Sequence, residues 1–191
     1  MTSSDLERPL REFFQKSRIA LALARADGDN ELALVNTLFT SLTGYDEEDV
    51  VGRNCRLLQE SAKGIRADNA VAKDNIHEFL RSDGPATVRT PIVNFRKDGA
   101  PFVNLLFMSK LKSASGKVSY IFASQFDVSR THAEMLDAYD QQLSRTLKGL
   151  QPLLEGHDVM VNGTLSTIAN STAVIAQAKL TLAELETNAP Y

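Results

Sequence analysis

The chain has 191 residues, 43% of them hydrophobic, and a formal net charge of −3 at pH 7. This length suffices for one well-buried domain with an appendage, and no run of about 18 apolar residues is present to span a membrane. Residues 130–191 carry four Lys or Arg against seven Asp or Glu, the opposite of the balance that nucleic-acid binding needs. One cysteine cannot form an internal disulfide, and no apolar signal segment precedes the domain, so we expect a cytoplasmic protein.

The predicted elements divide the chain into three parts. Residues 1–17 favour a short amphipathic helix that caps the N-terminus. Residues 18–128 hold strands in 18–26, 31–35, 86–96, 101–111 and 118–127, and helices in 36–51 and 67–81. Two strands, a helical middle and a three-strand meander predict an α+β domain, with a five-stranded antiparallel sheet covered by helices on one face.

The third part, 129–191, is predicted to be a helical extension. Apolar residues recur there at alternating three- and four-residue steps, interrupted near Pro152 and Gly156. The first stripe is Leu136, Tyr139, Leu143, Leu147, Leu150 and Leu154. The second is Leu165, Ile168, Thr172, Ile175, Lys179 and Leu182, in which Thr172 and Lys179 interrupt the apolar pattern. A narrow stripe suits a helix–helix seam better than burial on a sheet, so we expect a homodimer held by these helices. An unidentified signalling protein is the other expected partner.

Cys55, in "VGRNCRLLQ", is the only cysteine of the chain. The simplest interpretation is a small buried hydrophobic residue. A catalytic thiolate would need a positioned base, but two of the three histidines, His132 and His157, fall in the tail. One cysteine without clustered histidines or carboxylates also excludes a metal site.

Three carboxamides follow the predicted meander. A three-residue loop at 98–100 would pair Asn94 with Asn104, and a four-residue loop at 113–116 would pair Asn104 with Gln125. The three amides would then form a row on a face that is otherwise apolar, with Ile92, Leu106, Met108, Ile121 and Ala123. Such a row is costly unless each amide finds a partner. The amides could bond one another at a wet edge, or bind a flat ligand with alternating donors and acceptors, such as a flavin.

These segments resemble a known family. "GRNCRLLQ", "NF" at Asn94, "NLLF" at Asn104 and "ASQFD" around Gln125 are similar to the light-oxygen-voltage (LOV) domain, the flavin-binding branch of the PAS fold, over about residues 14–128. The resemblance implies a short-LOV-type blue-light photoreceptor that binds FMN. It also implies that Cys55 forms a light-driven covalent bond with the C4a carbon of the flavin, which breaks in the dark. The protein would be a reversible switch, not a turnover enzyme.

The resemblance also assigns roles to other residues. Asn54 and Gln59 match ribityl contacts, and Arg56 matches the arginine that pairs with the phosphate. Asn94 and Asn104 match the amides at the pyrimidine edge, and Gln125 matches the glutamine near flavin N5, whose amide can flip. The residues expected along the ring are Phe39, Leu58, Leu106 and Ile121.

The sequence departs from the family pattern at a few positions. Leu57, Leu106 and Ile121 stand where Phe is frequent, and these swaps should tune the lifetime of the covalent state. The segment between Gln59 and Asn94 is longer than the family minimum. Arg66 in that segment is the candidate for a second phosphate arginine, and a solvated loop charge is the alternative.

Three alternatives to a photoreceptor remain open. A flavin redox enzyme would need a nicotinamide site, and the sequence has no glycine-rich phosphate loop for one. The tail faintly resembles the phosphoacceptor helix of LOV histidine kinases, with His157 in the acceptor's place, which would make it a phosphotransfer remnant. The chain could also be a ligand-free PAS interaction module, in which Cys55 and the amides are structural.

Overall fold

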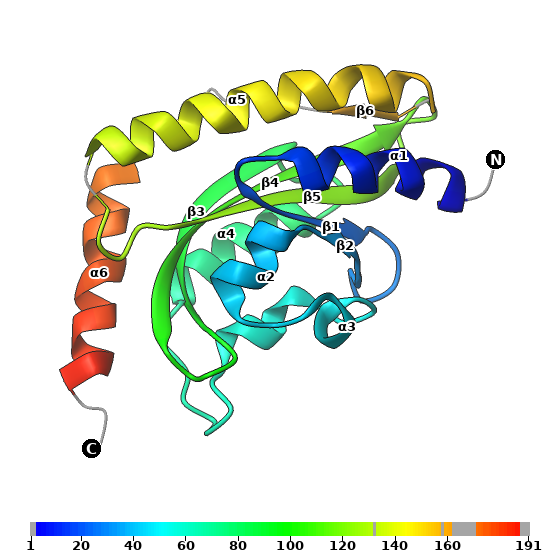
Figure 1. The fold of residues 1–191 in the computed structure, drawn as a ribbon. Helices are drawn as coiled ribbons and strands as arrows, with labels where there is room; N and C mark the ends of the chain where they lie inside the picture. Colours follow the sequence, from blue (N-terminus) through cyan, green and yellow to red (C-terminus); the bar gives the residue numbers. More distant parts are fainter. Residues whose placement is uncertain (1–2, 132, 158, 162–170, 188–191) are drawn as a thin grey trace.

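The computed structural model describes residues 3–131, 133–157, 159–161 and 171–187 (Figure 1). Leu165 and Ile168 of the second predicted stripe lie outside the described residues. The elements in chain order are α1 (Ser3–Lys16), β1 (Ala20–Arg25), β2 (Leu32–Val35), α2 (Thr37–Thr43), α3 (Glu47–Val50), the 3₁₀ helix η1 (Cys55–Gln59), α4 (Ala70–Leu80), β3 (Thr87–Phe95), β4 (Pro101–Ser113), β5 (Val118–Asp127), α5 (Ala133–Glu155), β6 (Val159–Val161) and α6 (Ser171–Thr187). None of the described helices combines the length and the apolarity needed to cross a bilayer.

The sheet is antiparallel, with strand order β2-β1-β5-β4-β3. The predicted α+β class and the five predicted strands are confirmed. A short sixth strand, β6, comes from the tail and pairs with the end of β4 at residues 111–113. The tail is therefore joined to the sheet by backbone hydrogen bonds.

The predicted register of the meander is wrong by two residues in both hairpins. Asn94 lies opposite Phe102 rather than Asn104, and Gln125 lies opposite Leu106. In the first hairpin the loop closes one residue earlier than expected, because Gly99, with φ of 90°, takes its left-handed last position. In the second, Gly116 does the same, with φ of 82°, and a bulge follows. An even shift keeps every side chain on its predicted face, so the three amides still share one face.

The helices of the 18–128 domain lie on one face of the sheet, as predicted, but the flanking helices cover the other face, which the sequence did not predict. Figure 1 shows α2, α3 and α4 on one face, and α1, α5 and α6 on the other. We call these the inner and the outer face. The outer face is lined by alternate strand residues such as Leu105, Phe107 and Phe122, all buried. Since the strands carry apolar residues at successive positions, both sides of the sheet need a cover.

The tail stripe packs on this outer face, so the prediction of a seam free to pair with another helix is wrong for α5. Four of its stripe residues, Tyr139, Leu143, Leu150 and Leu154, belong to the same buried cluster as the outer strand residues. From α6, Ile175 and Leu182 join the cluster. A narrow stripe fits a partner helix, but it also fits the apolar outer face, which the periodicity of the tail alone does not reveal.

Candidate functional site

A cavity lies between the inner face of the sheet, η1 and α4. Nine of the residues predicted to bind a flavin line it: Asn54, Cys55, Arg56, Gln59, Asn94, Asn104, Leu106, Ile121 and Gln125. The cavity measures about 110 Å³, and pockets for molecules of flavin size usually hold at least about 300 Å³. A tricyclic ring therefore requires side chains of the wall to move. Met108, whose side chain is flexible, and Leu80, which is 39% exposed, are placed to do so.

Cys55 opens η1, at the edge of this cavity. Gly52, with φ of 80°, turns the chain into the segment, and Asn54 caps η1 by accepting a hydrogen bond from the backbone N–H of Arg56 at 2.9 Å. Burial raises the pKa of the Cys55 thiol to about 12. The sulfur therefore carries its proton at neutral pH, so this residue can supply both a sulfur and a proton to a bound molecule.

The three amides line the inner face and differ in how they are bonded. Asn104 Nδ2 donates to Asn94 Oδ1 at 3.0 Å, and Asn104 Oδ1 accepts from the backbone N–H of Phe126 at 3.3 Å. Gln125 is 2% exposed, and neither its Nε2 nor its Oε1 has a hydrogen-bond partner. Leaving a buried amide unpaired costs about 1–3 kcal/mol. This cost fits a site built for a ligand that carries both donors and acceptors, as the edge of a flavin does.

The apolar walls come from all five strands of the main sheet and from α4. The predicted Leu106 and Ile121 lie on the wall. Phe39 and Leu58 instead pack in the buried cluster beside Cys55, behind the wall. Several further wall residues were not predicted as ring contacts, namely Ala22, Ala24, Ile76, Leu80, Ile92 and Met108. Ile92 and Met108 already belonged to the predicted apolar face. Strand alternation in β1 identifies Ala22 and Ala24, and the four-residue spacing identifies Ile76 and Leu80.

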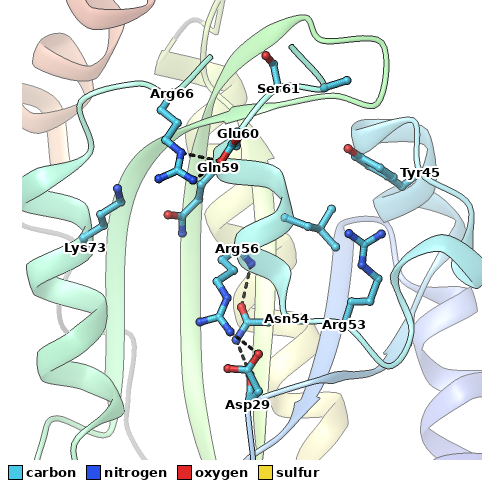
Figure 2. A pocket seen from close by; sticks show the side chains of 12 residues that line it. Asp29, Tyr45, Arg53, Asn54, Arg56, Gln59, Glu60, Ser61, Arg66 and Lys73 are labelled. Carbon is cyan, nitrogen blue, oxygen red and sulfur yellow. Dashed lines mark hydrogen bonds and ion pairs between the residues drawn. The ribbon is translucent and has the colours of Figure 1, made fainter. Parts of the chain in front are cut away.

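A wide groove of about 690 Å³ adjoins the cavity (Figure 2). Asn54, Arg56 and Gln59 line both spaces. The groove holds four cationic side chains, Arg53, Arg56, Arg66 and Lys73, and two carboxylates, Asp29 and Glu60. The two predicted phosphate arginines, Arg56 and Arg66, thus face one groove. Guanidinium groups at the open end of an apolar cavity suit a ligand with a phosphate on its polar end.

Behind Gln125, on the outer face, β5 contacts the tail. Ser124 Oγ and the Tyr139 hydroxyl lie 2.6 Å apart in a buried hydrogen bond. The Phe126 ring stacks on the Tyr139 ring with centroids 4.4 Å apart. Arg89 of β3, whose side chain is 3% exposed, pairs with Asp140 at 2.5 Å. The two residues that flank Gln125 are therefore both held by one side chain of α5.

His157, the proposed phosphoacceptor, is not on a helix. It follows the end of α5, and its backbone N–H donates to Leu154 O at 2.9 Å in a turn before β6. The phosphotransfer hypothesis expects the acceptor histidine on a helix, and His157 instead lies in a turn. Within the described ranges, no group of three His, Cys, Asp or Glu side chains could hold a metal ion.

Comparison with known proteins places these features in a family. A PAS domain model matches residues 6–130. Blue-light-activated histidine kinase 1 of Erythrobacter litoralis is 32% identical over 139 residues, which is 72% of this chain and 37% of that protein. A blue-light-activated histidine kinase of Rhizobium johnstonii is 33% identical over 134 residues, 68% of this chain and 36% of that protein. The chain thus spans just over a third of the length of these curated relatives.

Solved structures of LOV proteins are also similar to this chain. The LOV domain of the Erythrobacter litoralis EL346 blue-light-activated histidine kinase is 33% identical, with a TM-score of 0.52, over 59% of this chain and 98% of that one. The Rhodobacter sphaeroides LOV protein has a TM-score of 0.67 over 97% of both chains, at 23% identity, and shows the shared fold. The chain therefore belongs to the PAS domain family and carries, within that family, a LOV domain of the blue-light receptor class.

Proposed function

We propose that the protein binds FMN non-covalently and that blue light joins Cys55 to the flavin C4a carbon in a bond that breaks again in the dark. The unpartnered amide of Gln125, buried in the wall of the cavity that Cys55 borders, carries this proposal. Structural amides would be expected to be bonded, as Asn94 and Asn104 are to each other. A ligand-free interaction module gives no reason for an unpaired glutamine.

Different residues would bind the ring, the ribityl chain and the phosphate of FMN. Asn94, Asn104 and Gln125 would hold the pyrimidine edge of the ring, and Leu106 and Ile121 would pack on its faces. Asn54 and Gln59 would contact the ribityl chain between cavity and groove, and Arg56 and Arg66 would hold the phosphate. Bound flavin would supply the absorption of blue light and an electrophilic carbon.

Cys55 would supply the rest of the reaction. Its S–H bond would break, its sulfur would bond to C4a and its proton would go to N5 as the C4a=N5 double bond becomes single, so the addition needs no external oxidant or base. The raised pKa keeps this proton on the sulfur in the dark. Gln125 would then meet a donor where it had met an acceptor, and its amide would turn to match. The cycle returns the thiol and consumes no substrate, so we propose a switch and not an enzyme.

The rotation of Gln125 would reach the tail through β5. Ser124 and Phe126 flank Gln125 and both contact Tyr139 of α5. A change in the strand's hydrogen bonding would therefore alter how α5 sits on the outer face. We propose that the tail is the output and that it controls homodimerisation or the binding of a signalling protein. A light-state dimer is described for the fungal blue-light photoreceptor Vivid, which is 28% identical over 56% of this chain and 76% of the Vivid chain.

An absorption spectrum of the purified full-length chain, recorded before and after blue light, tests the proposal. We expect a flavin spectrum that bleaches and recovers in the dark, together with FMN in the heat-released supernatant. Cys55→Ala should keep the flavin and lose the reversible bleaching. A colourless protein that takes up no added flavin would refute the proposal. The cytoplasmic location expected from the single free cysteine is part of the same proposal.

A further inference from the structure

The two arginines assigned to the phosphate are already bonded to carboxylates within the groove. Arg56 forms an ion pair with Asp29, and Arg66 Nε donates to Glu60 Oε2 at 2.6 Å (Figure 2). Both guanidinium groups are mostly exposed, at 63% and 70% of their side-chain areas. Each guanidinium therefore has a carboxylate on an edge that a phosphate would otherwise take.

The backbone places Asp29 beside Arg56. The carbonyl of Asp29 accepts a hydrogen bond from Asn54 Nδ2, and Glu31 forms a β-bridge with Asn54. The β1–β2 loop is thereby fixed to the segment that leads into η1. Because these contacts use the main chain of Asp29 and Glu31, they do not depend on the Asp29 carboxylate.

Glu60 is placed in a comparable way. Glu60 and Arg66 are partners in a β-bridge, and the Ser61 N–H donates to Ile65 O at 2.9 Å. This small hairpin sets the Glu60 and Arg66 side chains beside each other at the rim of the groove. Two separate backbone devices thus bring a carboxylate to each of the two arginines.

The other two cations of the groove are not neutralised in this way. Within the part of the chain that the structure describes, no carboxylate pairs with Arg53 or Lys73. The groove therefore still attracts an anion, but Arg56 and Arg66 must exchange partners to bind it. A phosphate monoester carries about −1.5 to −2 charges at pH 7 and would repel a carboxylate left beside it.

We propose that Asp29 and Glu60 set the cofactor specificity by competing with the flavin phosphate for Arg56 and Arg66, an inference that rests on the proposed binding of FMN. FMN must displace both carboxylates to reach the guanidinium groups. Riboflavin has the same ring and ribityl chain but no phosphate, so it binds without displacing them. The two acids thus reduce the advantage of FMN over riboflavin.

The test compares FMN and riboflavin affinities of the flavin-free full-length chain by fluorescence titration. Exposed ion pairs contribute about 0.2–1 kcal/mol, so Asp29→Asn and Glu60→Gln should each tighten FMN binding by about 1.5- to 5-fold at low ionic strength. Riboflavin affinity should not change. The double variant should show about the product of the two factors, and added salt should shrink the gain.

Asp83→Asn is the matched control, since Asp83 also forms an exposed ion pair, with Arg81, but lies outside the groove. It makes the same change in net charge and should leave both affinities unchanged. Arg56→Gln should act in the opposite sense and weaken FMN alone. Equal ratios of FMN to riboflavin affinity in the parent, Asp29→Asn and Glu60→Gln chains would overturn the inference. So would an equal loss of both flavins in Asp29→Asn, which would make Asp29 a support for the loop. Failure of the parent to bind either flavin would refute the proposed function itself.

Discussion

Ser124 and Tyr139 meet across the outer face through a buried hydrogen bond of 2.6 Å, directly behind Gln125. Successive strand residues point to opposite faces, so the cavity amide and the contact with α5 are neighbours on β5. A single peptide bond therefore separates Gln125, which lines the cavity, from Ser124, which contacts α5. Burial also raises the pKa of Tyr139 to about 12, which keeps its hydroxyl protonated and able to donate.

Tyr139→Phe tests this link. The change leaves the Ser124 hydroxyl buried without its partner, and we expect a loss of about 1–2 kcal/mol in the free energy of unfolding. The photocycle should remain, and the light-dependent change in α5 should shrink. Urea unfolding and amide hydrogen exchange of residues 134–155, in dark and light, measure the two effects.

The matched control for this link is a cycle with Ser124→Ala. Because removing both partners leaves nothing unpaired, the double variant should be more stable than the sum of the single effects implies. Strict additivity would mean that the 2.6 Å contact contributes nothing to the packing of α5.

Gln125→Leu separates photochemistry from output. The covalent step should persist, since it uses Cys55, but the tail should respond less to light because no amide can turn. In the flavin-free chain the same variant should raise the free energy of unfolding by about 1 kcal/mol, since it removes an unpaired buried amide. Small-angle scattering in dark and light measures the first effect, and chemical unfolding the second. An unchanged light response would contradict the proposed route.

The pH dependence of Cys55 follows from its raised pKa. The folded thiol has a pKa of about 12 against an ordinary 9.0, so the folded state favours the protonated form. Its contribution to stability is complete below pH 9 and is lost as the pH rises from 9 toward 12. In the flavin-free chain at pH 8, iodoacetamide should modify Cys55 far more slowly than a free thiol, and Cys55→Ala gives the blank. Alkylation at the rate of a model peptide would contradict this.

The homodimer prediction needs a test that keeps the tail. Truncation after Ser129 would expose the outer face and remove several large side chains of α5, each of which stabilises by about 1.5–3 kcal/mol when fully buried. We expect that fragment to unfold readily or aggregate. Light scattering of the full-length chain in dark and light is the sharper measurement. We expect a dimer in at least one state, and a monomer in both would overturn the prediction.

A charge on the exposed surface of the tail is a gentler probe of the same dimer. Met135 is 53% exposed on α5 and Leu180 is 59% exposed on α6. Met135→Lys and Leu180→Glu should each weaken the dimer if those faces meet a second copy. Lys148→Glu, an exposed charge change on α5, serves as the comparison. None of the three substitutions should alter the visible spectrum.

The sequence predicted the site better than the arrangement around it. Cys55 and the three amides could be found because motif and strand alternation decide which face a side chain takes. The register could not, because it depends on which loop position Gly99 occupies, and a slide of one residue there moves the pairing by two. The position of the tail helices on the outer face could not be predicted for a different reason. The stripe of Tyr139 and Leu143 is compatible with any apolar surface, and the surface it covers is formed by alternate residues of several strands.

The cover of the outer face by α5 has a thermal consequence. If light loosens that helix, apolar surface meets water, and the heat capacity of the lit protein rises above that of the dark one. Cooling weakens the hydrophobic contribution that holds α5 in place. The same flash of light should therefore release the tail more completely in a cold solution than near room temperature. The response of the tail would then depend on temperature as well as on light.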